Sequence, residues 1–123
     1  CLSGRTTIAK SRIPIVMGVQ TLSVSEFKAW RDDNKACVLL DVREDGEVAY
    51  ANIEGHTHIA MNLIPLRHNE LPDDQPIVVY CHHGMRSMQV ALFLEHAGFS
   101  DVYNLSGGIE AWSVQIDPSV ARY

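Results

Sequence analysis

Short apolar runs alternate with segments of helical periodicity along most of the chain. The clearest run is Pro76–Tyr80, which is rich in β-branched residues and has the length of a strand. Cys37–Val42 is a second run, and its unbroken apolar character is typical of a strand buried on both faces. Shorter strands are predicted at Gln20–Leu22, His56–Ala60 and Asp101–Leu105.

Helical segments lie between these strands. Ser23 and Glu26 have the spacing of a capping box, which predicts that a helix begins just after Ser23. The segment after Pro76–Tyr80 places apolar residues at helical spacing and ends at Gly98, a common helix stop. The expected helices are Val24–Asp32, Glu44–Tyr50, Ser87–Ala97 and Ile109–Trp112, with a loop or short helical turn over Pro65–Leu71.

Regular alternation of strands and helices predicts an α/β fold. Such a chain forms a parallel sheet, here of about five strands, with helices on both faces. The sequence of 123 residues has the length of one domain and contains no repeat or linker. We expect a single domain over residues 20–123, preceded by a partly ordered N-terminal arm over residues 1–19.

The charge balance excludes several classes of protein. Ten Lys and Arg against fifteen Asp and Glu give a net charge of −5, which is unfavourable for general binding to nucleic acid or to an anionic membrane. A hydrophobic fraction of 46% excludes intrinsic disorder, and no apolar run has the length of a membrane span. We therefore expect neither nucleic acid nor membrane partners.

The cysteines are Cys1, Cys37 and Cys81. Three scattered cysteines without a C-x-x-C pair indicate neither a disulfide framework nor a zinc ribbon. They suit a reducing compartment, so a cytoplasmic location is expected. Cys37 opens an apolar strand and is expected to be inert core. The first residue is Cys1 rather than Met, which indicates a processed product or a piece of a longer protein.

Cys81 has the sequence context of a reactive thiol. It directly follows the clearest strand and precedes a helix, and Gly84 allows a tight turn between the two. Backbone N–H groups of that turn, the helix N-terminus and the charge of Arg86 all favour a thiolate, so the pKa of Cys81 should be depressed. The competing interpretation is a small buried apolar residue at a strand end.

Four segments in the right order resemble the motifs of the rhodanese sulfurtransferase superfamily. The resemblance covers Thr21 to Trp112 and is strongest in CHHGMRS after IVVY, which resembles the family's active-site loop. The other segments are LLDVRE, EVAYANIEG and YNLSGGIEAW, which begin at Leu39, Glu47 and Tyr103. The resemblance implies a rhodanese-like three-layer α/β fold.

The resemblance also implies a reaction and a site. The Cys81 thiolate would take a sulfane sulfur from a small anionic donor such as thiosulfate and pass it, as a persulfide, to a thiol, a protein acceptor or cyanide. No metal and no organic cofactor are implied. Asp41 and Arg43 would lie at the rim of the site or support it structurally, with Glu47 as a partner for Arg43, and a direct contact with substrate stays the alternative. The loop expected to bind the persulfide consists of His82, His83, Gly84, Met85, Arg86 and Ser87.

Two other functions stay open at this point. One is a non-catalytic interaction or regulatory domain of rhodanese type. The other is a cysteine phosphatase or arsenate reductase, because related folds use a loop with Cys and Arg. The six-residue spacing from Cys81 to Arg86 is one residue shorter than the C-x5-R of such phosphatases, which favours sulfur over phosphate. The two histidines of the loop weaken the case for thiosulfate as the physiological donor.

Overall fold

Residues 19–123 are described by a computed structural model. The predicted arm lies outside the described residues except for Val19, which begins the first strand, and Cys1 lies outside them as well. The strands are β1 (Val19–Leu22), β2 (Val38–Asp41), β3 (Thr57–His58), β4 (Ile77–Tyr80) and β5 (Val102–Leu105). All five predicted strands are present, and β3 is shorter than the predicted His56–Ala60.

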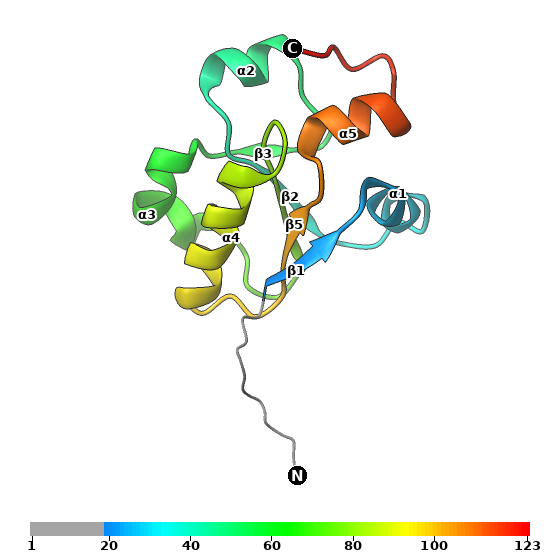
Figure 1. The fold of residues 1–123 in the computed structure, drawn as a ribbon. Coiled ribbons are helices and arrows are strands. Elements are labelled where there is room, and N and C mark those ends of the chain that lie inside the picture. The colour runs from blue at the N-terminus through cyan, green and yellow to red at the C-terminus, as the bar shows by residue number, and fades with distance from the viewer. Residues whose placement is uncertain (1–18) are drawn as a thin grey trace.

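The five strands form one sheet in the order β1-β5-β4-β2-β3, and every neighbouring pair is parallel (Figure 1). This confirms the predicted α/β class. Strand β4 lies at the centre between β5 and β2, and all four of its residues are buried. Its continuous apolar sequence is what a strand covered on both faces requires.

The helices differ from the prediction mainly at their ends. Helix α4 begins at Met85, before the predicted Ser87, because Gly84 adopts a left-handed conformation (φ 115°) that turns the chain directly into the helix. The capping box of Ser23 and Glu26 is confirmed at the start of α1. The helices are α1 (Val24–Asp32), α2 (Asp45–Tyr50), α3 (Ile64–Arg67), α4 (Met85–His96) and α5 (Gly108–Gln115), with 3₁₀ turns η1 (Met61–Leu63) and η2 (His68–Glu70).

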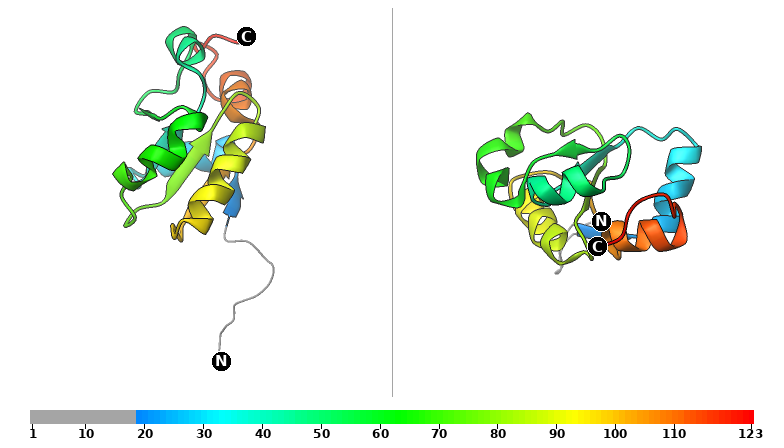
Figure 2. Two further views of the ribbon diagram at one scale, coloured as in Figure 1. Left: turned by 90° about the vertical axis from the view of Figure 1, so that its left-hand side faces the viewer. Right: turned by 90° about the horizontal axis from the view of Figure 1, so that it is seen from above.

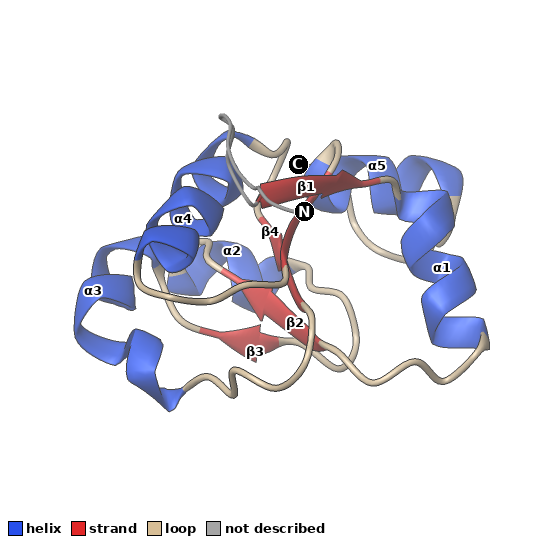
Figure 3. Cartoon of the chain, turned by 90° about the horizontal axis from the view of Figure 1, so that it is seen from below, coloured by secondary structure: helices blue, strands red, loops and turns tan. Residues whose placement is uncertain are grey.

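Side chains alternate between two cores, one on each face of the sheet. Ile77, Val79 and Cys81 point into a core shared with α3 and α4, whereas Val78 and Tyr80 point into a core shared with α1 and α5. Viewed from below, the sheet lies between these two pairs of helices, which gives three layers (Figure 3).

The carboxyl ends of the strands share one edge of the sheet, where open α/β folds bind ligands. The loop after β4, the N-terminus of α5 and helix α2 lie at this edge (Figure 1). Two further views place the C-terminal end of the chain beside α2 (Figure 2). Within residues 19–123, no helix has both the length and the apolar character needed to cross a membrane.

Candidate functional site

Cys81 lies at the bottom of a turn of backbone that faces its sulfur. We call residues 81–87 the Cys81 loop; its last three residues form the first turn of α4. Cys81 is buried, with only 1% of its surface exposed. The backbone N–H of Gly84 donates to Cys81 Sγ over 3.1 Å, and the Ser87 hydroxyl lies 3.4 Å from the same atom. The loop thus directs several hydrogen-bond donors at one sulfur.

This environment favours the thiolate. Burial alone would raise the pKa of Cys81, because a charge is poorly solvated inside the protein. Hydrogen bonds from the Ser87 hydroxyl and from the backbone N–H groups of Ser87, Gly84 and His83 outweigh burial, so the pKa of Cys81 lies below its ordinary value. Backbone N–H groups directed at one atom stabilise negative charge on it, as in an oxyanion hole.

The N-terminus of α5 supports the loop from behind. The backbone N–H of Ile109 donates to the Cys81 carbonyl over 2.9 Å, and that of Glu110 donates to the His82 carbonyl over 3.1 Å. This contact is so close that a Cβ on Gly108 would collide with both carbonyl oxygens. The GGIEAW segment therefore holds Cys81 and His82, the first two residues of the Cys81 loop. From the sequence this segment was expected only to form a turn into a helix.

Asn104 ties the loop to the neighbouring strand β5. Its side-chain amide donates to the Gly84 carbonyl over 3.2 Å, and its Oδ1 accepts from the Ser87 hydroxyl over 2.5 Å. Ser87 has one hydroxyl proton, so its hydroxyl can donate a hydrogen bond either to Asn104 Oδ1 or to Cys81 Sγ. No sequence signal pointed to Asn104, because a single polar residue in a short strand has no distinctive pattern.

Arg86 is held by a carboxylate from another part of the chain. Its Nη1 and Nη2 donate to Glu47 Oε1 and Oε2 of helix α2 over 2.7 and 2.9 Å, a bidentate pair. The pair lowers the pKa of Glu47 to about 2. The sequence places Arg86 in the loop expected to bind the persulfide. Its partner in the structure is Glu47, and a contact of Arg86 with a bound persulfide stays a prediction.

Asp41 and Arg43 form a separate, fully buried pair after the adjacent strand β2. Both side chains are 0% exposed, and Arg43 binds both carboxylate oxygens of Asp41, over 2.9 and 2.7 Å. Arg43 also donates to the Ala51 carbonyl over 2.6 Å. The prediction that Arg43 forms an ion pair with Glu47 is wrong, because the carboxylate partner of Arg43 is Asp41. Arg43 contacts only the backbone oxygen of Glu47, at 3.4 Å.

Two histidines of the loop form an aromatic stack with the end of the chain. The ring of His82 lies between His83 and Tyr123, with centroid distances of 3.9 Å to each. His82, His83 and Glu110 bring one potential ligand atom each within 4.8 Å of one another. A metal ion lies near the plane of every imidazole that binds it, and stacked rings share no such point. Glu110 is moreover paired with Arg122. The cluster is therefore a stack rather than a ligand set.

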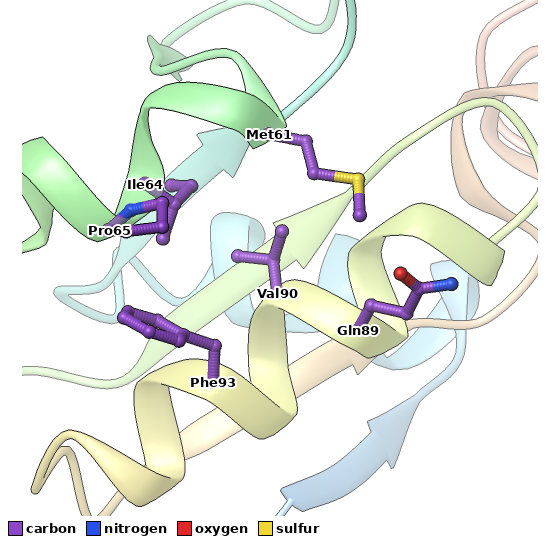
Figure 4. A pocket seen from close by; sticks show the side chains of 6 residues that line it. All are labelled: Met61, Ile64, Pro65, Gln89, Val90 and Phe93. Carbon is purple, nitrogen blue, oxygen red and sulfur yellow. The ribbon is translucent and has the colours of Figure 1, made fainter.

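An apolar hollow of about 200 Å³ lies along α4, next to η1 and α3 (Figure 4). No residue of the Cys81 loop lines it. Met85, the first residue of α4, is one of the most exposed apolar side chains at 78%. The hollow is lined by Met61, Ile64, Pro65, Gln89, Val90 and Phe93.

Of the predicted loop, the structure directs Gly84 and Ser87 at Cys81 Sγ, and it separates the other described cysteine from them. Met85 is exposed, and the Arg86 side chain pairs with Glu47. Cys37 precedes β2, and Cys81 follows β4, so the two lie at opposite edges of the parallel sheet. Burial raises the pKa of the partly buried Cys37 thiol. This burial outweighs the charges of Arg31 and Lys35, which lower the pKa of Cys37, so a thiolate is disfavoured there and favoured at Cys81.

Comparisons with known proteins identify the family and agree with the fold. Residues 23–115 match the rhodanese-like domain. The chain is 39% identical to a sulfurtransferase of Allochromatium vinosum, over 72% of this chain and 83% of that protein. It is 36% identical to the thiosulfate sulfurtransferase GlpE of Haemophilus influenzae, over 72% of this chain and 85% of that protein. A solved rhodanese-like domain protein of Staphylococcus aureus superposes with a TM-score of 0.74 at 29% identity, covering 85% and 98% of the two chains.

Proposed function

The chain belongs to the rhodanese-like domain family, and on that premise we propose that it transfers sulfane sulfur through a persulfide on Cys81. The observation that carries the proposal is the convergence of the Gly84 N–H and the Ser87 hydroxyl on Cys81 Sγ. The sulfurtransferase relatives support sulfur transfer in general. The proposal adds that Cys81 Sγ is the atom that carries the transferred sulfur.

The reaction has two balanced steps. In the first, the Cys81 thiolate attacks the outer sulfur of thiosulfate; a new S–S bond forms at Cys81, the old S–S bond breaks, and sulfite leaves with its electron pair. In the second, a thiolate or cyanide attacks the outer sulfur, and the Cys81 thiolate leaves. No external oxidant or reductant is needed, and ping-pong kinetics are expected.

The surroundings of Cys81 suit both steps. The lowered pKa of Cys81 provides a thiolate for attack and makes the same group a good leaving group. The loop N–H groups can hold the charge of the persulfide. A reduced cysteine is needed in every cycle, which agrees with the expected cytoplasmic, reducing location.

Replacement of one cysteine at a time tests the proposal. Cys81→Ser should abolish turnover of thiosulfate and cyanide, whereas Cys37→Ser, at the opposite edge of the sheet, should retain it. The same two proteins and the parent are then assayed with an aryl phosphate. Turnover by the Cys81→Ser protein would exclude the proposed nucleophile, and Cys81-dependent hydrolysis of the aryl phosphate without sulfur transfer would favour a phosphatase instead.

A further inference from the structure

Tyr123 joins three parts of the site that are far apart in the sequence. Its ring stacks on His82 with a centroid distance of 3.9 Å and an interplanar angle of 9°. Its hydroxyl donates to Glu47 Oε2 over 2.8 Å and accepts from Arg43 Nη1 over 2.9 Å. The match to the rhodanese-like domain ends at residue 115, so Tyr123 lies outside the part of the chain that the family describes.

One end of this contact chain is rigid. The Arg43 side chain is fully buried and is fixed by the Asp41 carboxylate and by the Ala51 carbonyl. Through the Tyr123 hydroxyl, this fixed group is linked to Glu47, whose carboxylate holds Arg86. Charge-assisted hydrogen bonds of this kind are short and directional. The position of Arg86 therefore depends on the buried pair through two intermediates.

The other end of the chain reaches the Cys81 loop directly. His82 is the residue after Cys81, and its carbonyl is already held by the N–H of Glu110. The Tyr123 ring covers the face of the His82 ring opposite His83, so the imidazole is held between two rings. Among residues 19–123, the buried His82 Nε2 finds no hydrogen-bond partner, so within this part of the chain contacts of the ring faces hold the imidazole.

Resting on the proposed sulfur transfer, we propose that Tyr123 is a positioning residue for the Cys81 loop. The ring fixes His82, and the hydroxyl fixes the Glu47–Arg86 pair. Together they keep the N–H groups of the loop directed at Cys81 Sγ. Tyr123 is 43% exposed, belongs to neither apolar core and does not touch Cys81, so its effect on the thiolate passes through these neighbours.

Two substitutions separate the contributions of the ring and the hydroxyl. Tyr123→Phe keeps the stack and removes the hydroxyl bridge, whereas Tyr123→Leu removes both. Tyr103→Phe is the matched control, because Tyr103 is a partly buried tyrosine whose ring packs on Trp30 and not on the site. The readout is the rate of Cys81 alkylation by iodoacetamide as a function of pH, followed for the Cys81 peptide alone by mass spectrometry.

We expect Tyr123→Leu to raise the midpoint by about one pH unit, which lowers the alkylation rate roughly tenfold at a pH below the midpoint. Tyr123→Phe should show a smaller shift in the same direction, and Tyr103→Phe should match the parent protein. An unchanged profile in Tyr123→Leu overturns the inference. If Tyr123→Leu does not fold, the comparison of Tyr123→Phe with Tyr103→Phe decides it in the same way.

The outcome is separable from that of the proposed function. Each protein is also incubated with thiosulfate and with cysteine persulfide, and its intact mass is measured. If the parent protein gains no sulfur on Cys81 from either donor, the proposed function fails. If the parent gains sulfur and the Tyr123 variants keep the parent's pH profile, the inference about Tyr123 alone fails.

Discussion

The loops after β2 and β4 leave the sheet at the same edge, but they direct their polar groups differently. Strands β2 and β4 are neighbours, and Asp41 is paired in register with Tyr80, the residue before Cys81. After β2, the chain turns its charges inward, and Arg43 satisfies Asp41 within a fully buried pair. After β4, the chain turns its backbone N–H of Gly84 toward a sulfur. The first loop pairs its own two charges and reaches Tyr123 through Arg43, whereas the second directs its donors at the Cys81 sulfur.

The comparison shows that an arginine near the site is not by itself evidence for anion binding. Both arginines are paired: Arg43 with Asp41, and Arg86 with Glu47. They differ in burial, since the Arg43 side chain is 0% exposed and that of Arg86 is 34% exposed. The buried Asp41–Arg43 pair mainly stabilises the fold and anchors Tyr123, whereas the partly exposed Glu47–Arg86 pair adds less stability and lies directly at the Cys81 loop.

The largest expected effect concerns the buried pair. Arg43→Met leaves the Asp41 carboxylate buried without its cation and should lower the free energy of unfolding by about 3–5 kcal/mol. Arg86→Met is the matched control, and it should cost about 1 kcal/mol or less because its partner is near solvent. Denaturant unfolding measures both.

A double variant sharpens this test. Asp41→Asn with Arg43→Met removes the charge that Arg43→Met strands, so part of the lost stability should return. Equal losses for Arg43→Met and Arg86→Met would show that the two loops do not differ as described.

The second expected effect is that the Glu47–Arg86 pair makes the free energy of unfolding depend on pH. The pKa of Glu47 is lowered in the folded state to about 2, from an ordinary 4.5. A lowered pKa stabilises the fold above the unfolded value, and that stabilisation is lost as the pH falls toward about 2. Because both side chains of the pair are partly exposed, solvent screening reduces this contribution to on the order of 1 kcal/mol. The difference in unfolding free energy between the parent and Glu47→Gln should therefore shrink between pH 5 and 2.

Glu70→Gln is the control for that measurement. Glu70 pairs with Arg67 on the surface, where solvent weakens the interaction. A parent-minus-variant difference that is as small for Glu47→Gln as for Glu70→Gln at pH 6 would contradict a Glu47–Arg86 pair that is stronger than a surface pair.

The smallest expected effect is on the thiolate itself. Ser87→Ala removes the hydroxyl that lies 3.4 Å from Cys81 Sγ and should raise the pKa of Cys81, by about one pKa unit or less. The pH dependence of Cys81 alkylation measures it. Ser113→Ala, which removes a buried hydroxyl bonded to the Val120 carbonyl, is the control. A midpoint that does not move would indicate that the Ser87 hydroxyl donates to Asn104 Oδ1 rather than to Cys81 Sγ.

The sequence predicted the features that depend on local pattern. The strand β4 and the turn at Gly84 each depend on a few consecutive residues, namely an apolar run and a glycine after it. The strand, the loop and the following helix could therefore be predicted from the sequence. The alternation of strands and helices likewise predicted the parallel sheet. The exact start of α4 was missed because it depends on the left-handed conformation of Gly84, which sequence alone does not specify.

Partner choice could not be predicted from the sequence. Glu47 was assigned to Arg43, which is close to it in the chain, yet its carboxylate pairs with Arg86, which lies 39 residues away. Tyr123 was missed for the same reason, since it meets Glu47 across 76 residues. Such contacts arise only when α2, the Cys81 loop and the end of the chain meet at one edge of the sheet.

The measurement that tests the central claim most directly is the intact mass of the protein after incubation with a sulfane sulfur donor. Thiosulfate and cysteine persulfide serve as two donors, each followed by removal of excess donor. The proposal predicts a gain of one sulfur atom, located on the Cys81 peptide, reversed by dithiothreitol and absent from Cys81→Ser. An unchanged mass with both donors, or the same gain in Cys81→Ser, would contradict the assignment of Cys81 as the sulfur carrier.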